Sequence, residues 1–139
     1  MKETKIAKEV AEQEFKDWCE SNMIDCDTSD MSEDDEKEFN GIKKRIVNAI
    51  CAGRCTFNGR DMVYTVSPCT PELAGKEITI HPANGYTYVA LDGLKNEQDI
   101  KRLHAALAQM TGLSDGIIRK MDAADLKVLQ GVFSLFLAD

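Results

Sequence analysis

The chain has 139 residues, with 17 lysines and arginines against 24 aspartates and glutamates, and 43% of its residues are hydrophobic. This length and composition fit one globular domain and exclude a multidomain enzyme, a collagen-like chain and a disordered chain. The net charge of −7 argues against nucleic-acid binding, because phosphate binding needs a basic face that releases counterions.

Two amphipathic helices are predicted in the first part of the chain. Between Thr4 and Met23 the apolar residues recur at steps of three to five, with lysine and glutamate between them. The second helix begins after Ser32, an N-cap residue that has Asp35 in the capping-box position. It is expected to end at Gly53, where a left-handed C-cap fits.

A small β-meander is predicted next. Asn58 and Gly59 readily take the positive φ angles of a type I′ turn, which predicts a hairpin between two strands. The second strand, 61–66, places Met62, Tyr64 and Val66 on one face. A third short strand at 77–81 completes a meander that needs helices over one face for stability.

The last part of the chain is predicted to be helical. Residues 86–94 fit either a strand end or a short helix. A helix that opens at Asn96 is closed by Gly112, and a short helical turn follows. Asp122, with Asp125 at its third position, then caps a final helix with two apolar rows. Such a helix must be buried against more than one neighbour, within the domain or across a subunit interface.

These segments together predict a single α+β domain over residues 1–139. It comprises an acidic N-terminal helical pair at 1–53, a three-stranded antiparallel meander and loop at 54–94, and a C-terminal helical group at 95–139.

The sequence favours a non-enzymatic protein of the cytoplasm. Its beginning lacks the apolar core of a signal peptide, and no run of about 18 apolar residues suggests a membrane span. The five cysteines are an odd count, so reduced thiols are expected. Neither a nucleophile motif nor a phosphate-binding glycine loop occurs, so we expect no catalysis, no cofactor and no small-molecule substrate.

An acidic segment between the first two helices partly matches a calcium-binding loop. Oxygen-bearing side chains occupy template positions 1, 3, 5, 9 and 12. Position 6, which requires glycine, is Asp30, so the alternative is a solvated acidic linker that leads into a helix N-cap. The candidate calcium ligands are Asp25, Asp27, Ser29, Glu33 and Glu36.

Residues 76–139 carry a family resemblance. An extended segment at 76–80 is followed by a helix that ends in Met-Thr-Gly-Leu-Ser at 110–114. After a short helical link comes Met-Asp-Ala-Ala-Asp-Leu at 121–126, which leads into the apolar helix. This order resembles the small tail assembly chaperones of tailed phages and prophages, in which a "tGLs…i.kLdaaDl..l" pattern precedes a closing apolar helix.

The resemblance implies a helper that binds the long helical tape-measure protein during tail assembly in the host cytoplasm. A prophage protein with another structural role is an alternative, as is a calcium-binding helix-loop-helix module. Homo-oligomer formation is also expected, because a helper that coats a long partner gains by repeating one contact. The partner-binding candidates lie on the two-sided final helix and are Val128, Leu129, Val132, Phe133, Leu135 and Phe136.

Overall fold

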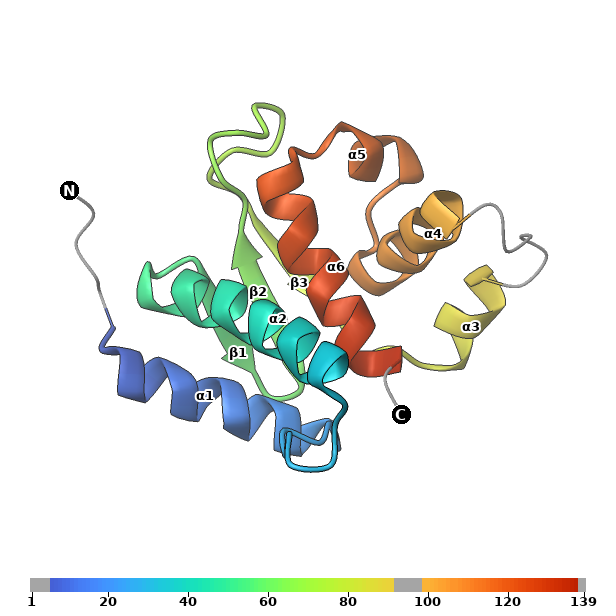
Figure 1. Ribbon diagram of the computed structural model, residues 1–139. Helices are drawn as coiled ribbons and strands as arrows, with labels where there is room; N and C mark the ends of the chain where they lie inside the picture. The colour runs from blue at the N-terminus through green and yellow to red at the C-terminus, as the bar shows by residue number, and fades with distance from the viewer. Residues whose placement is uncertain (1–5, 92–98, 138–139) are drawn as a thin grey trace.

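The computed structural model describes residues 6–91 and 99–137 and has a small sheet flanked in sequence by helices (Figure 1). The elements are α1 (Lys8–Ser21), α2 (Glu33–Cys51), β1 (Cys55–Asn58), β2 (Asp61–Thr65), β3 (Glu77–Ile80), α3 (Gly85–Leu91), α4 (Asp99–Thr111), α5 (Asp115–Lys120) and α6 (Ala123–Leu137). The predicted α+β class is confirmed. In the described ranges no helix combines the length and apolar character that crossing a bilayer requires.

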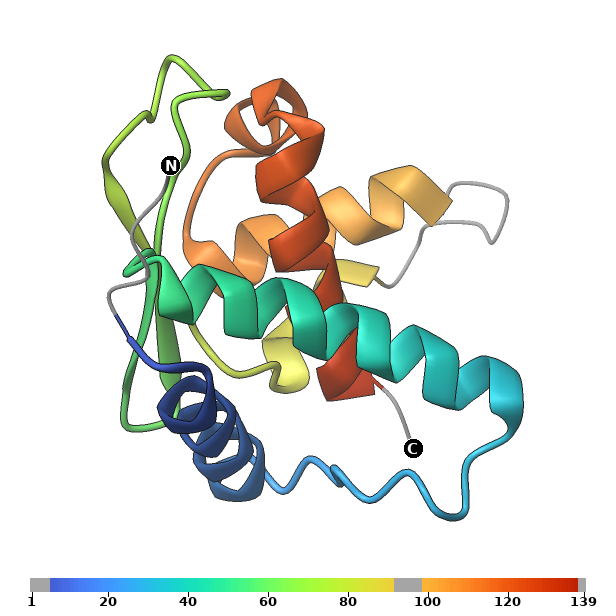
Figure 2. The same ribbon diagram turned by 60° about the vertical axis from the view of Figure 1, so that its left-hand side comes forward.

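The sheet is an antiparallel meander in the order β1-β2-β3. It forms one layer, and the helices pack over one of its faces (Figures 1 and 2). Met62, Tyr64 and Val66 are buried on that face, together with Ile78 and Ile80 of the neighbouring strand. The alternation predicted for both strands is therefore confirmed, and the helices provide the cover that a three-stranded sheet needs.

The hairpin turn differs from the prediction by one residue. Asn58 pairs with Asp61, so the two turn residues are Gly59 and Arg60 rather than Asn58 and Gly59. Gly59 has a φ of 62°, whereas Asn58 and Arg60 have negative φ angles. A type II′ turn needs a positive φ only at its first central position, and glycine meets that need alone. The predicted type I′ turn is therefore wrong.

Both ends of α2 form as the sequence predicts. The Ser32 hydroxyl accepts a hydrogen bond from the Asp35 N–H at 3.2 Å. At the other end Gly53 has a φ of 77° and donates its N–H to the carbonyl of Ile50, while the Arg54 N–H bonds the carbonyl of Ala49. This pair of bonds is a Schellman motif, which satisfies two of the last carbonyls of the helix.

The segment that the sequence left open is helical where the structure describes it. Residues 85–91 form α3, and the Asn84 side chain accepts a hydrogen bond from the Tyr86 N–H at its start. The predicted opening of the next helix at Asn96 lies outside the described residues. Gly112 follows the last residue of α4 with a φ of 74°, which confirms the predicted end of that helix.

An aromatic cluster centred on Trp18 holds α1 against the rest of the fold. The Trp18 ring stacks on Phe57 of β1 with centroids 5.3 Å apart and meets Phe136 of α6 edge-on at 5.7 Å. Its indole N–H donates to the carbonyl oxygen of Arg60 at 3.0 Å. One side chain thus joins the first helix, the hairpin and the last helix, and aromatic pairs of this kind contribute beyond their buried area.

Helix α6 lies between α2 and α4, which confirms that its two apolar rows need two neighbours (Figure 1). At the crossing with α2 the backbones approach closely. A Cβ atom on Gly131 would lie 3.0 Å from Cγ2 of Ile42, whereas a Cβ on Gly41 of α2 would meet nothing within 4 Å. The absence of a side chain at 131 therefore sets how closely the two helices pack.

These two glycines give a matched pair for a stability test. Gly41→Ala should stabilise the protein by about 0.5–1 kcal/mol, because alanine loses less entropy than glycine in a helix. Gly131→Ala should destabilise it by about 1–2 kcal/mol, because overpacking against Ile42 outweighs the same gain. Urea unfolding of both variants measures the difference. Equal stabilisation by the two alanines would show that the crossing is not tightly packed.

Candidate functional site

The apolar residues of α6 that the sequence proposed for partner binding lie mostly in the core. The exposed fraction is 6% or less for Val128, Leu129, Val132 and Leu135. Phe136 is half-buried against Trp18, and Phe133 is half-buried beside the same core. The structure thus gathers all six residues on one helix, but the four most buried present no surface to another protein.

Asp125, which the sequence placed at the third position behind the cap residue Asp122, is a buried carboxylate that accepts four hydrogen bonds. Asp125 has no exposed surface. Its Oδ1 accepts from the Tyr64 hydroxyl at 2.5 Å and from the Ser67 N–H at 3.0 Å. Its Oδ2 accepts from the Ser67 hydroxyl at 2.9 Å and from the Thr70 hydroxyl at 2.6 Å. We call Asp125, Tyr64, Ser67 and Thr70 the carboxylate clasp.

The clasp alters the acidity of its members. Burial alone would raise the pKa of Asp125, but the hydrogen bonds from Thr70, Tyr64 and Ser67 outweigh it and hold the pKa below its ordinary value. Burial, followed by the hydrogen bond to Asp125, raises the pKa of the Tyr64 phenol. The carboxylate therefore stays ionised and the phenol stays protonated, which is the pairing that a short hydrogen bond requires.

The sequence contained a signal for this role. Asp125 precedes Leu129 and Val132 by four and seven residues, so it lies on the buried row of α6. The predicted cap at Asp122 is confirmed, because its side chain accepts from the Ala124 N–H at 2.9 Å. An acidic residue on the apolar row of a helix therefore indicates a buried acceptor of hydrogen bonds from a neighbouring element rather than a helix cap.

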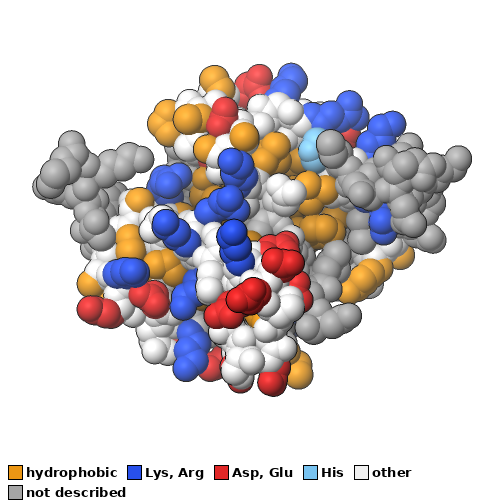
Figure 3. Space-filling view, in the orientation of Figure 1, with side chains coloured by type: hydrophobic (Ala, Val, Ile, Leu, Met, Phe, Trp, Pro, Cys, Tyr) orange, Lys and Arg blue, Asp and Glu red, His pale blue; other side chains and the backbone are white. Residues whose placement is uncertain are grey.

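Among the residues whose burial is described in the C-terminal half, the large exposed apolar side chains lie on helix α3. Tyr86, Tyr88 and Val89 are 75%, 57% and 69% exposed. Thr87, between them in sequence, is fully buried and hydrogen-bonded to Gln109 of α4, which anchors the helix. Hydrophobic side chains show over α3 at the right of Figure 3. We call Tyr86, Tyr88 and Val89 the α3 patch.

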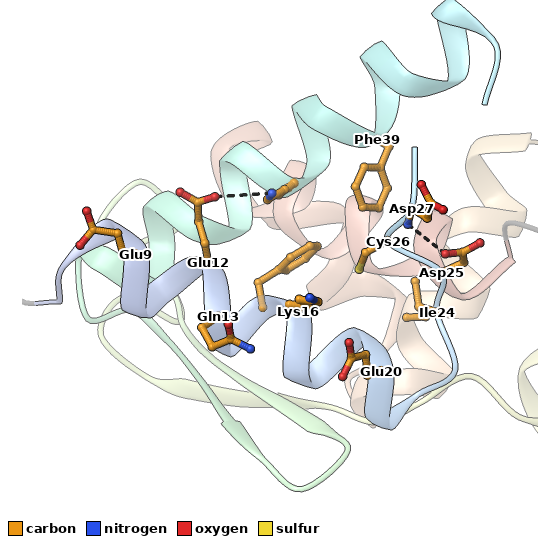
Figure 4. A pocket seen from close by; sticks show the side chains of 12 residues that line it. Glu9, Glu12, Gln13, Lys16, Glu20, Ile24, Asp25, Cys26, Asp27 and Phe39 are labelled. Atoms are coloured by element: carbon orange, nitrogen blue, oxygen red, sulfur yellow. Dashed lines mark hydrogen bonds and ion pairs between the residues drawn. The ribbon is translucent and has the colours of Figure 1, made fainter. Parts of the chain in front are cut away.

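A groove of about 700 Å³ lies between α1, the loop at 22–32 and α2 (Figure 4). Its apolar floor includes Phe15, Ile24, Cys26 and Phe39. Its rim on α1 is a row at helical spacing, Glu9, Glu12, Gln13, Lys16 and Glu20. We call this feature the α1–α2 groove.

The rim of the α1–α2 groove is predominantly acidic. Five carboxylates and two ammonium groups line it, which leaves a net charge of −3. One of the ammonium groups, that of Lys43, lies 3.5 Å from the carboxylate of Glu12. Hydrogen bonds from the backbone and side chain of Ser29 lower the pKa of Asp27, so this rim carboxylate is ionised at neutral pH. The groove thus combines an apolar floor with a negative edge.

The predicted calcium ligands do not converge. The Oδ1 of Asp25 accepts from the Asp27 N–H, and the Oδ1 of Asp27 accepts from the Ser29 N–H, both at 2.9 Å. Glu33 and Glu36 lie instead in the first turn of α2. In the described ranges 6–91 and 99–137 no group of three or more acidic, histidine or cysteine side chains is placed to hold a metal ion. The segment has the geometry of a linker with two Asx turns that leads into a helix cap.

A second, basic groove lies on the surface where α2 and α6 meet. Lys37, Arg45 and Lys127 line it together with one carboxylate, that of Glu38. Basic side chains gather along α2 and α6 in the middle of Figure 3. The surface charge of this acidic protein is therefore divided, with the acidic groove and the basic groove on different sides of α2.

Two of the thiols are buried and unreactive in character. Burial, followed by a hydrogen bond with Cys26, raises the pKa of Cys19. Burial raises the pKa of Cys55 to about 12. Both thiols are therefore protonated at neutral pH, whereas a cysteine nucleophile needs a thiolate.

Comparison with protein-family models, with curated proteins and with solved structures gives no match to this chain.

Removing the clasp carboxylate should destabilise the protein strongly. Asp125→Ala leaves the buried hydroxyl of Tyr64 and the N–H of Ser67 without their acceptor, which should cost about 2–4 kcal/mol. The control is Asp115→Ala, which removes an exposed carboxylate paired with Arg119 and should cost less than about 1 kcal/mol. Urea unfolding compares them, and similar losses in the two variants would contradict the clasp.

The clasp should also make stability depend on pH in the acid range. The pKa of Asp125 is lower in the folded protein than the ordinary value of 3.8, so the unfolded chain binds the proton more tightly. The stabilisation is complete above the unfolded pKa and is lost as the pH falls through the folded pKa. Between about pH 5 and about pH 2 the urea midpoint of Asp125→Asn should fall less steeply than that of the unmodified protein. Parallel curves would contradict this prediction.

Proposed function

We propose that this protein is a non-enzymatic helper that binds a helical protein partner, in the manner of phage tail assembly chaperones, and that the α3 patch is a contact surface. The observation that carries the proposal is the exposure of Tyr86, Tyr88 and Val89 on an anchored helix. Tyrosine is enriched in protein interfaces because its ring buries apolar area while its hydroxyl stays hydrated.

The position of the α3 patch supports this assignment. It lies inside residues 76–139, the part of the chain that resembles tail assembly chaperones. The Thr87 side chain holds the helix to α4, so the backbone that carries the patch is already ordered and binding loses little conformational entropy there. Because four of the six candidate residues on α6 are buried, we assign the partner contact to α3 rather than to α6. A bacterial host cytoplasm is the compartment that this role requires.

Co-expression with the large helix-rich protein encoded nearest to this chain tests the proposal. The soluble fraction of that partner should rise when this chain is present, because its apolar faces are covered. The triple variant Tyr86→Ser, Tyr88→Ser, Val89→Ser should remove most of the rescue, because it deletes the exposed apolar area of α3.

A matched control uses the exposed apolar residues elsewhere on the surface. Val10 and Met23 are 51% and 94% exposed and lie on and just after α1. The variant Val10→Ser, Met23→Ser should keep the rescue, and both variants should melt near the temperature of the unmodified protein. A partner that is equally insoluble with and without this chain would overturn the proposed function.

A further inference from the structure

The α1–α2 groove has the two properties that select an amphipathic ligand with positive charge. Its floor exposes parts of Ile24 and Cys26 above the buried rings of Phe15 and Phe39, and this surface favours apolar side chains. Carboxylates stand at both ends, with Glu9 and Glu12 near the start of α1 and Asp25 and Asp27 in the loop (Figure 4). From this charge complementarity we propose that the groove binds a lysine- or arginine-bearing amphipathic helical segment of another protein.

The dimensions of the groove suit a helical segment. The rim row runs from Glu9 to Glu20 along one face of α1, and at about 1.5 Å per residue this is about 16 Å, or three turns of a partner helix. A helix laid in a groove buries its apolar stripe on the floor and directs its polar edges to the rims. Basic residues near the two ends of such a helix would then meet Glu9 and Glu12 at one end of the groove and Asp25 and Asp27 at the other (Figure 4).

The charges of the groove are poorly neutralised by its own residues. Lys43 pairs with Glu12, but Glu9, Glu20 and Asp25 have no ion pair among the described residues. The carboxylate of Asp27 is also held ionised. A basic ligand would therefore find unpaired negative charge beside an apolar surface, which gives orientation and a faster association rate. This inference concerns a surface distinct from the α3 patch and does not rest on the proposed function.

Three synthetic peptides of 14 residues, the length of α1, provide the probe. They share one leucine-rich face and carry lysine, glutamine or glutamate on the polar face. Titration of fluorescently labelled peptide with the full chain should give one site per protein and the affinity order lysine, then glutamine, then glutamate. Affinity for the lysine peptide should fall at least about tenfold between low and high salt, because exposed charges are screened.

Charge reversal locates the site. Glu9→Lys together with Glu20→Lys should weaken the lysine peptide at least about tenfold, because it replaces two attractive charges by two repulsive ones. Glu72→Lys together with Glu77→Lys changes the net charge equally at exposed positions outside the groove and should leave binding within about twofold.

Four outcomes would overturn the proposal. One is failure of the lysine peptide to bind, and another is equal binding of the lysine and glutamine peptides. If the groove reversal and the control reversal weakened peptide binding equally, the peptide would be held only by long-range attraction to the net charge of the protein. Self-association of the protein without peptide, abolished by the groove reversal, would assign the groove to a second copy of the chain. None of these results depends on the tape-measure-like partner, so the groove and the proposed function can fail separately.

Discussion

The carboxylate of Asp125 is withdrawn from solvent, and the four donors that hold it are neutral. Burying a charge costs several kcal/mol, so each of these hydrogen bonds must be made for the arrangement to persist. Three of the donors belong to Ser67 and Thr70 in the loop after β2, the fourth is the hydroxyl of Tyr64 in β2, and the acceptor lies in the first turn of α6. The link also extends to the helix cap, because the Thr70 hydroxyl accepts the N–H of Asp122 at 2.8 Å. The orientation of α6 on the sheet follows from this requirement.

The rest of the fold is arranged around α6 once the clasp fixes it. Gly131 allows α2 to cross closely, and Phe136 meets Trp18 near the other end of the helix. Trp18 in turn positions α1, so the acidic row of the α1–α2 groove is displayed at a defined distance from α2. Both proposed binding surfaces thus depend on the core, and Phe15 and Phe39 under the α1–α2 groove belong to it.

Much of the architecture follows from local patterns in the sequence. The cap at Ser32, the left-handed residue at Gly53 and the alternation around Tyr64 are each determined by residues within one turn or strand, which is why they could be predicted. The predicted hairpin turn was displaced by one residue. Gly59 fits the second central position of a type I′ turn and also the first central position of a type II′ turn, and only the pairing of Asn58 with Asp61 decides between the two.

The candidate sites were less predictable because they are formed by residues far apart in the chain. The periodicity of α6 shows that Leu129 and Val132 share a face, but not whether a neighbour in the same chain covers it. The groove combines a row on α1 with a loop and with Phe39 of α2, and no short motif encodes that combination. For Asp125 the local capping pattern competed with the helical spacing, and the spacing was the better guide.

The clasp also has a consequence for the order in which the chain can fold. Tyr64 and Asp125 are separated by 61 positions, so the ribosome adds the acceptor Asp125 well after it has added strand β2 with the donor Tyr64. During synthesis the hairpin leaves the ribosome with its phenol and the Ser67 N–H still hydrated, and the sheet cannot bury them until α6 has emerged. Contacts of such long sequence separation slow folding. The nascent chain therefore passes through a period in which the helical pair is complete but the apolar face of the sheet is only partly covered.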